Sequence, residues 1–449
     1  MDPISDWHGL LRPDVELGRE FWEEFSAGMR ARKLTFGDRV HCPFLRPFFL
    51  TEADEARMRK AAETIAALGE RVVRAALESR TLFDQLELTE AETELVRIDP
   101  GYETASTASR LDAFLLPDSL HFAEYNAESP AGLGYTERLC ELFDALPVMR
   151  RFREGRKVRF HRTIRPMLDA LVASYREWGG RADPPAVAIV DWRDVPTWSE
   201  FEILRDSFVA AGVPTVVADP RDLEHTGGTL RVKGQPIDLV YRRVLMNDIV
   251  ARPEDCRPLV EAYREHVVCV ANTFRCKLAH KKAFFAVLTD PVNALLFSDA
   301  EKAVIAAHVP WTRVVRETKT DKDGRREDLL AIAERERESL VLKPNDEYGG
   351  KGVFLGWETS AGDWGRALQH ALTDPAGRWI VQQRIPVRRE VFPMFDGDGT
   401  ASMREMLVDF APYLFRGKMA GYLTRLSATG LANVTSGGGQ VPAFVVGDR

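Results

Sequence analysis

The amino-acid sequence predicts a mixed protein of several lobes, part α/β and part α+β. Three observations favour this class. The chain has 449 residues, more than one hydrophobic core usually spans. Residues 183–282 alternate between buried apolar runs and helical stretches, which is typical of a parallel sheet. Residues 300–445 mix short strands with helices, which indicates an α+β arrangement.

The first hundred residues are expected to be mainly helical. Residues 51–54, Thr-Glu-Ala-Asp, resemble a capping box with aspartate in place of glutamate, and a strong 3.6-residue apolar period follows them. Residues 89–92, Thr-Glu-Ala-Glu, form a second box. We interpret residues 1–100 as a helical region with a packing role.

The segment 101–180 is expected to begin with a β-hairpin. Its strands cover residues 111–116 and 120–125, and the turn Pro-Asp-Ser at 117–119 joins them. A helix follows from about Tyr135 to Phe143. The change from helical to strand character near residue 105 therefore sets the boundary of the N-terminal region.

Residues 181–285 are expected to form a Rossmann-like lobe. Buried strands at 186–190, 214–217, 237–241 and 267–271 alternate with helical stretches. The first strand is followed by Asp-Trp-Arg-Asp-Val-Pro rather than by G-x-G-x-x-G, which argues against a dinucleotide site and a Rossmann oxidoreductase. The remaining segment, 286–449, holds the α+β elements.

Composition excludes some classes of function. The balance of 61 basic and 68 acidic residues, a net charge of −7, argues against a sequence-independent nucleic-acid binder. No apolar run reaches the roughly 18 residues that a bilayer span needs, and no signal peptide is visible. The five cysteines are scattered without a C-x-x-C pair, which fits a reducing compartment, so a cytoplasmic location is expected.

The most informative stretch is a glycine-rich segment at 341–356. An apolar run ends at Lys343, and Gly349, Gly350 and Gly352 follow before a second apolar run begins. A lysine at a strand end beside a glycine loop suits a polyphosphate, because the loop offers backbone donors and the lysine a point charge. The segment is not a Walker P-loop, because Lys351 precedes Gly352 and a β-run. The alternative is a hairpin whose glycines serve only the turn.

Polar residues on the predicted hairpin form a second candidate group. Strand alternation places Arg110 and Asp112 on one face, and Glu124 and Asn126 on one face. If the strands pair in register, Asp112 and Glu124 become cross-strand neighbours. Such oxygen ligands are those that Mg²⁺ accepts beside phosphate oxygens, and Arg110 could hold a phosphate. The alternative is the polar outer face of an antiparallel hairpin.

Together the two groups resemble the ATP-grasp superfamily, in which a lysine and glycine loop work with an acidic residue and an E-x-N pair. Here the metal motif precedes the lysine, an order similar to the circularly permuted branch that includes the glutathionylspermidine synthetase type. The resemblance covers most of residues 105–440. It implies that ATP lies between two α+β subdomains, formed by residues 101–180 and 286–449, with residues 181–285 as a substrate lobe.

The resemblance also implies roles for individual residues. Asp112, Glu124 and Asn126 would hold Mg²⁺, and Arg110 and Lys343 would act on the reacting groups. Arg425 would contact phosphate or the acyl group, with a surface arginine as the alternative. One of the adjacent lysines Lys281 and Lys282 would be a further phosphate clamp, since helix period lets only one of them face the site. The strand and hinge at 379–386 look like the adenine contact, although an ordinary core strand is the alternative. The full set expected to contact ATP is Lys281, Lys282, Lys343, Tyr348, Gly349, Gly350, Lys351, Gly352, Gln382, Gln383 and Ile385.

A carboxylate substrate is expected beside this site. The loop at 126–134 leads into a helix, and its Ser129, its glycines and the helix N-terminus could bind an anion. Arg242 and Arg243 end a strand of the Rossmann-like lobe, where they could bind a substrate carboxylate or, as the alternative, lie in solvent.

The activity implied by the resemblance is ATP-dependent ligation of a carboxylate to an amine through an acyl phosphate. The substrates would be small molecules, such as amino acids, peptides or polyamine-like amines. A nucleotide-binding module of the same fold without ligase activity is the alternative. No sequence feature identifies the substrates or an oligomeric state.

Overall fold

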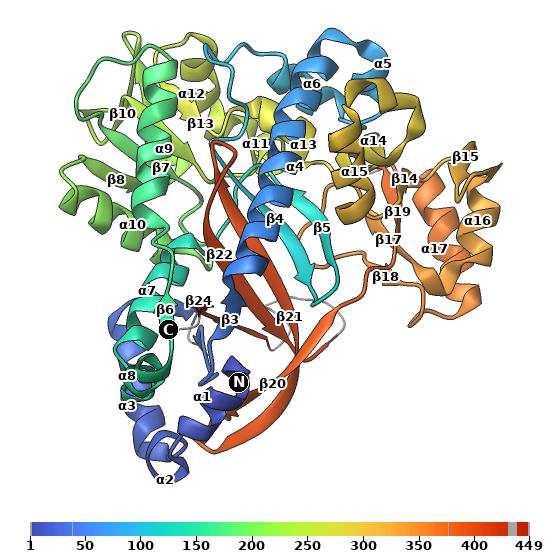
Figure 1. The fold of residues 1–449 in the computed structure, drawn as a ribbon. Helices are drawn as coiled ribbons and strands as arrows, with labels where there is room; N and C mark the ends of the chain where they lie inside the picture. The colour runs from blue at the N-terminus through green and yellow to red at the C-terminus, as the bar shows by residue number, and fades with distance from the viewer. Residues whose placement is uncertain (1, 38, 376, 430–437, 448–449) are drawn as a thin grey trace.

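The computed structural model describes residues 2–37, 39–375, 377–429 and 438–447. Its centre is a six-stranded sheet in the order β23-β22-β21-β4-β5, with β20 paired to β21. Figure 1 shows the long strands β21 and β22 from the end of the chain beside the earlier hairpin β4–β5, with α4 (Glu52–Glu78) crossing over them. The strands of this sheet are β4 (Ala108–Leu115), β5 (Leu120–Asn126), β20 (Arg388–Phe395), β21 (Ala401–Phe415), β22 (Lys418–Ser427) and β23 (Gly439–Val441).

The predicted hairpin is confirmed, and it pairs in the expected register. Asp112 on β4 lies opposite Glu124 on β5, and a bulge follows Asp112. The other edge of β4 pairs with β21, where Arg110 lies opposite Tyr413. Because β4 joins the hairpin to β21, the polar residues near 110 and 124 lie beside strands formed by the last fifty residues of the chain.

A second sheet is parallel throughout, as the alternation of residues 183–282 predicts. Its order is β13-β12-β7-β8, and each pair of neighbours is parallel. Its strands are β7 (Val187–Val190), β8 (Thr215–Ala218), β12 (Leu239–Arg242) and β13 (Cys269–Ala271). Neighbouring helices include α9 (Ile164–Glu177), α10 (Trp198–Ala210), α11 (Met246–Ala251) and α12 (Pro253–Arg264), and a small antiparallel sheet interrupts the alternation with β9 (Leu223–Thr226), β10 (Thr229–Val232) and β11 (Gln235–Pro236).

A third sheet carries the glycine-rich segment. It is antiparallel, in the order β14-β19-β17-β18, and has a hydrophobic core of its own around Leu342, Trp364 and Val381. Its strands are β14 (Thr312–Val314), β17 (Leu340–Pro344), β18 (Phe354–Leu355) and β19 (Trp379–Gln383). α14 (Ala283–Thr289) and α17 (Ala361–Thr373) pack against it, and α16 (Leu329–Arg335) packs against α17 and the ribbon of β15 (Lys319–Lys322) and β16 (Arg325–Asp328). The helices α13 (Lys277–His280) and α15 (Asp299–His308) contact α4.

The N-terminal region is helical but shares the main core. Thr51 caps α4 by accepting from the Asp54 backbone N–H, and Thr89 and Glu92 form a complete capping box, as expected. A three-stranded sheet joins this region to the end of the chain, because β24 (Ala443–Gly447) pairs with both β3 (Phe48–Thr51) and β6 (Lys157–Arg159). The other helices are α1 (Pro3–Leu10), α2 (Pro13–Glu16), α3 (Arg19–Ala31), α5 (Arg80–Asp84) and α6 (Glu90–Val96), and the two-stranded ribbon is β1 (Thr35–Phe36) with β2 (Arg39–Val40).

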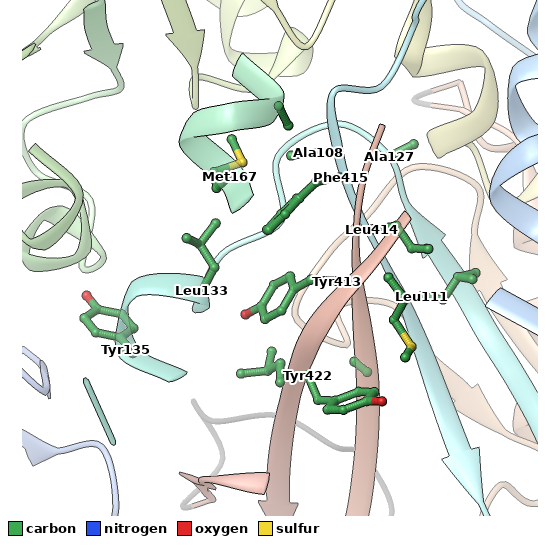
Figure 2. Close-up of a cluster of buried hydrophobic side chains, with 14 of the residues drawn as sticks. Ala108, Leu111, Ala127, Leu133, Tyr135, Met167, Tyr413, Leu414, Phe415 and Tyr422 are labelled. Atoms are coloured by element: carbon green, nitrogen blue, oxygen red, sulfur yellow. The ribbon is translucent and has the colours of Figure 1, made fainter. Parts of the chain in front are cut away.

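Apolar packing holds the central sheet against two helices that follow the hairpin. Leu133 of α7 (Leu133–Asp144) and Met167 of α9 lie near Tyr413 and Phe415 of β21 (Figure 2). All four side chains are buried. A further helix, α8 (Pro147–Gly155), follows α7. Within the described residues, no helix combines the length and apolarity that crossing a membrane requires.

Candidate functional site

A cavity of about 200 Å³ lies where the glycine-rich segment faces the hairpin β4–β5. Most of the residues predicted for an ATP and metal site line it. They are Asp112, Glu124, Lys282, Lys343, Tyr348, Gly349, Gly350, Lys351, Gln382, Gln383, Ile385 and Arg425. Lys343 Nζ donates to the carbonyl of Ala123 at 3.1 Å, although the two residues are 220 positions apart. The fold therefore brings the two predicted groups into one cavity.

The glycine loop has the backbone that its composition predicts. Gly349, Gly350 and Gly352 have φ values of 69°, 76° and 70°, in the left-handed region. Gly352 does not line the cavity; a Cβ there would lie 2.8 Å from the Pro344 side chain. The segment is a hairpin, because β17 and β18 pair antiparallel, and its turn also lines the cavity.

Two arginines hold Asp112 in the centre of the sheet. Arg110 Nε donates to Oδ1 at 2.8 Å, and Arg425 Nη2 donates to Oδ2 at 2.6 Å. Burial opposes ionisation of Asp112, but the two guanidinium groups outweigh it and hold its pKa well below the ordinary value. Arg110 itself does not line the cavity, and its Nη1 donates to the carbonyl of Ala131 at 3.1 Å. The guanidinium group of Arg110 therefore already has hydrogen-bond partners within the protein.

A third carboxylate, Asp409, completes this cluster. It lies opposite Arg425 in the pairing of β21 and β22, and Arg425 Nε donates to its Oδ2 at 2.5 Å. Asp409 is only 1% exposed, and its Oδ1 has no hydrogen-bond partner among the described residues. Burial raises the pKa of Asp409 to about 6, although Arg425 acts in the opposite direction.

Two lysines lie beside Glu124. Lys282 Nζ is 3.4 Å from Glu124 Oε2 and donates to the carbonyl of Glu347 at 2.7 Å. Burial opposes ionisation of Glu124, but Lys282, Lys343 and Arg425 together outweigh it and lower the pKa of Glu124. Lys343 is 8% exposed, and burial lowers its pKa to about 8. The carboxylate is therefore ionised at neutral pH, and Lys343 is close to its titration point.

The oxygen donors fit magnesium only in part. Asn126 Nδ2 donates to Glu124 Oε1 at 3.2 Å, so these two predicted ligands are adjacent. Asp112 already accepts from an arginine through each of its oxygens. No group of three or more His, Cys, Asp or Glu side chains within the described ranges is arranged to hold a metal ion. Glu124 and Asn126 fit a Mg²⁺ that takes its other ligands from phosphates and water.

Lys281 lies outside the cavity, in a buried network of charges. Its Nζ donates to Glu92 Oε1 and to Asp346 Oδ2, each at 2.7 Å. Asp346 also accepts from Lys277 Nζ at 2.9 Å. Of the two adjacent lysines, Lys282 lines the cavity, while Lys281 ties the start of the glycine loop to α6.

The residues predicted to bind a substrate carboxylate are engaged by the protein itself. Arg242 is fully buried, and its Nη1 donates to Glu128 Oε1 at 2.9 Å. Arg243 Nη1 donates to the carbonyl of Pro130 at 2.6 Å, and Ser129 Oγ donates to the carbonyl of Arg243 at 2.8 Å. None of the three predicted residues lines the cavity. Their side chains instead join the 126–134 loop to the end of β12.

The anion expected at the start of α7 is a side chain of the protein. The backbone N–H of Gly132 donates to both carboxylate oxygens of Glu200, at 2.8 and 2.9 Å, and that of Gly134 donates to Oε1 at 3.0 Å. Glu200 is 1% exposed. A carboxylate at a helix N-terminus is favourable, and here α10 supplies it, so the donors expected to meet a substrate are already used.

Comparison with known proteins shows the fold but no family. No family model matches the chain. The solved structure of a glutathione synthetase-like effector, GSS30, from Globodera pallida in its apo form is similar, with a TM-score of 0.64 at 12% identity, over 97% of this chain and 98% of that one. The two proteins share their fold. The uncharacterized protein sll0335 of Synechocystis is 27% identical over 260 residues, which are 54% of this chain. The match spans about half the length of that relative.

Sequence reasoning missed two carboxylates that line the cavity. Asp409 is the one acidic residue in the apolar run 407–415, and such a charge in a central strand is a signal of a buried partner or a site. Glu347 follows Lys343 by four residues at the start of the glycine loop. Glu347 lies in the glycine-rich segment 341–356, and Asp409 lies in the region 300–445, where short strands were expected.

Proposed function

We propose that this chain is an ATP- and magnesium-dependent carboxylate–amine ligase of the circularly permuted ATP-grasp type. The cavity carries this proposal, because it sets Lys343 and the glycine loop against Asp112 and Glu124. A fold shared with a protein described as glutathione synthetase-like supports it. In this proposal the segments 101–180 and 286–449 form the two halves of the nucleotide site, and 181–285 forms the substrate lobe.

ATP would lie between the glycine loop and the hairpin. Lys282 and Lys343 would neutralise its phosphates, and the loop at 349–352 would cover them. The apolar part of the cavity, with Val341, Leu355 and Ile385, suits the adenine ring. Gln382 would shape this pocket through its backbone, because its side-chain amide donates to Thr312 Oγ1 at 3.0 Å.

Magnesium would be held by Glu124 and Asn126 together with phosphate oxygens. When bound, it would supply positive charge to the phosphates during transfer. Asp112 accepts from a guanidinium group through each of its oxygens, so a contact with magnesium would have to use a remaining lone pair beside an arginine. Its present contacts suit a role in orienting Arg425 toward the cavity.

The reaction would proceed in two balanced steps. An oxygen of the substrate carboxylate bonds to the γ-phosphorus, the bond from that phosphorus to the bridging oxygen breaks, and ADP leaves. The amine nitrogen then bonds to the acyl carbon, the bond to the phosphate oxygen breaks, and the nitrogen loses a proton. Positioning and charge neutralisation by Lys282, Lys343 and Arg425 would account for most of the catalysis. The covering loop would keep water from the acyl phosphate.

The substrates would be small molecules. The similar structure is described as glutathione synthetase-like, which favours amino-acid or peptide carboxylates and amines, and polyamine-like amines are further candidates. We expect ADP release from Mg·ATP only when a suitable carboxylate and amine are both present, which a coupled assay over a panel of such pairs measures.

A variant pair tests the site behind this activity. Glu124→Ala should abolish ADP release, whereas Glu90→Ala, at an exposed position of α6, should leave it unchanged. Full activity of Glu124→Ala would show that the magnesium assignment is wrong. Binding of Mg·ATP by calorimetry without turnover of any pair would instead favour the ATP-binding module without ligase activity.

A further inference from the structure

The three carboxylates of the central sheet that line the cavity differ in how many of their oxygens already have a partner. Asp112 accepts from Arg110 through Oδ1 and from Arg425 through Oδ2. Glu124 has Lys282 Nζ 3.4 Å from Oε2, and a side-chain amide donates to its Oε1. These two side chains therefore have protein donors at both oxygens.

Asp409 is different, because only one of its oxygens is used. Oδ2 accepts from both Nε and Nη2 of Arg425. Oδ1 has no hydrogen-bond partner in the described part of the chain, although Asp409 is 1% exposed. A buried carboxylate oxygen without a donor is unfavourable, so an added donor at this point is favoured. Asp409 also lines the cavity.

The charges around Asp409 Oδ1 allow a positively charged donor to bind there. Arg110 and Arg425 contact Asp112 and Asp409, so these four side chains of β4, β21 and β22 sum to no net charge. A charged donor binds a carboxylate more strongly than a neutral one does. A primary ammonium is compact and carries three donors, which suits a narrow site next to an occupied guanidinium better than a second planar fork would.

We propose that Asp409 Oδ1 binds the ammonium group of the primary amine that this chain takes as a substrate. This inference rests on the proposed ligase function and deepens it by assigning the amine subsite. Arg425 then acts as a positioning residue, because it holds Oδ2 and leaves Oδ1 for the ligand. Lys343 lines the same cavity, where the phosphate would lie, so the amine would be held beside the acyl phosphate and would attack after the ammonium has lost one proton to solvent.

The test is a titration of the full chain with small ammonium probes. Ethylammonium chloride, glycinamide hydrochloride and 1,4-diaminobutane dihydrochloride are added, and the melting temperature is compared with that in sodium chloride of equal ionic strength. At least one probe should raise the melting temperature of the unaltered protein, and Asp409→Asn should weaken its apparent affinity about tenfold or more. Asp219→Asn, which alters a buried aspartate paired with Arg221 outside the cavity, should leave the affinity unchanged.

Two results would overturn the proposal: no probe stabilises the unaltered protein, or Asp409→Asn binds the probes as well as the unaltered protein does. If Asp409→Asn does not fold, the same titration is carried out with Asp409→Glu. It keeps the charge but moves it by one methylene, so an unchanged affinity for every probe would also overturn the proposal. The titration uses neither ATP nor turnover, so its failure is distinct from failure of the ligase assay.

Discussion

Replacing Lys281 or Lys282 with methionine should give two opposite phenotypes, although the residues are adjacent. Lys281 Nζ contacts Glu92 and Asp346 in a buried network, whereas Lys282 Nζ lines the cavity beside Glu124. Lys281→Met should therefore lower the free energy of unfolding. Lys282→Met should weaken the binding of Mg·ATP with a smaller loss of stability.

The contacts of the two lysines set the expected sizes of the losses in stability and in Mg·ATP affinity. Lys281 is 3% exposed, and removing one partner of a buried ion pair typically costs about 3–5 kcal/mol. Because Asp346 keeps its contact with Lys277, we expect Lys281→Met to lower the free energy of unfolding by about 3 kcal/mol, the lower end of this range. Lys282 would lose a charged hydrogen bond to phosphate, worth about 1.5–3 kcal/mol, or about 10- to 100-fold in Kd. The Lys282 side chain is only 10% exposed, but its contact with Glu124 is longer than that of Lys281 with Glu92, 3.4 Å against 2.7 Å, so the loss of stability in Lys282→Met should be smaller than that in Lys281→Met.

Urea unfolding and calorimetry with Mg·ATP measure the two quantities on the same preparations. Each variant is the matched control of the other, because both replace a lysine with methionine at neighbouring positions. The reasoning would be refuted if Lys281→Met kept full stability and lost nucleotide affinity, or if Lys282→Met bound Mg·ATP as tightly as the unaltered chain.

Three further outcomes are expected. Burial opposes ionisation of Glu128, but Lys277 and Arg242 together outweigh it and lower its pKa to about 2. The stabilisation is present above the unfolded pKa and is lost as pH falls toward 2, so urea unfolding from pH 6 to 3 should show a loss on the order of 2 kcal/mol that Glu128→Gln does not show. Lys343 has a pKa of about 8, so calorimetry should find weaker Mg·ATP binding as pH rises from 7 to 9, and Lys343→Arg should remove that dependence. Gly352→Ala should weaken Mg·ATP binding because the added Cβ would meet Pro344, whereas Gly365→Ala in α17 should leave the affinity unchanged. Equal affinities of the two variants for Mg·ATP would contradict a role of the glycine loop in covering the phosphates.

Local sequence patterns were enough to predict much of the fold. The hairpin register that sets Asp112 opposite Glu124 follows from alternation and a short turn, and both are properties of neighbouring residues. The left-handed glycines of the 349–352 loop and the capping at Thr51 and Thr89 have the same local origin. The parallel pairing of β7, β8, β12 and β13 follows from their alternation with helices.

The partners of charged residues could not be predicted in this way. The sequence marked Arg242, Arg243 and Ser129 as candidates because they end a strand or precede a helix, but the structure bonds them to groups of the protein. The donors at the start of α7 likewise meet Glu200 from α10, a helix more than fifty residues further along the chain.

Residue patterns alone pick out the segments that carry the candidate chemistry: the glycine loop after Lys343 and the hairpin with Asp112 and Glu124. Which side chains meet in the cavity depends on the packing of the whole fold. It placed Lys282 there and Lys281 in a buried network, and it added Asp409 from β21. The physical reason is that periodicity depends on neighbouring residues, whereas the partner of a buried charge depends on which distant strand packs against it.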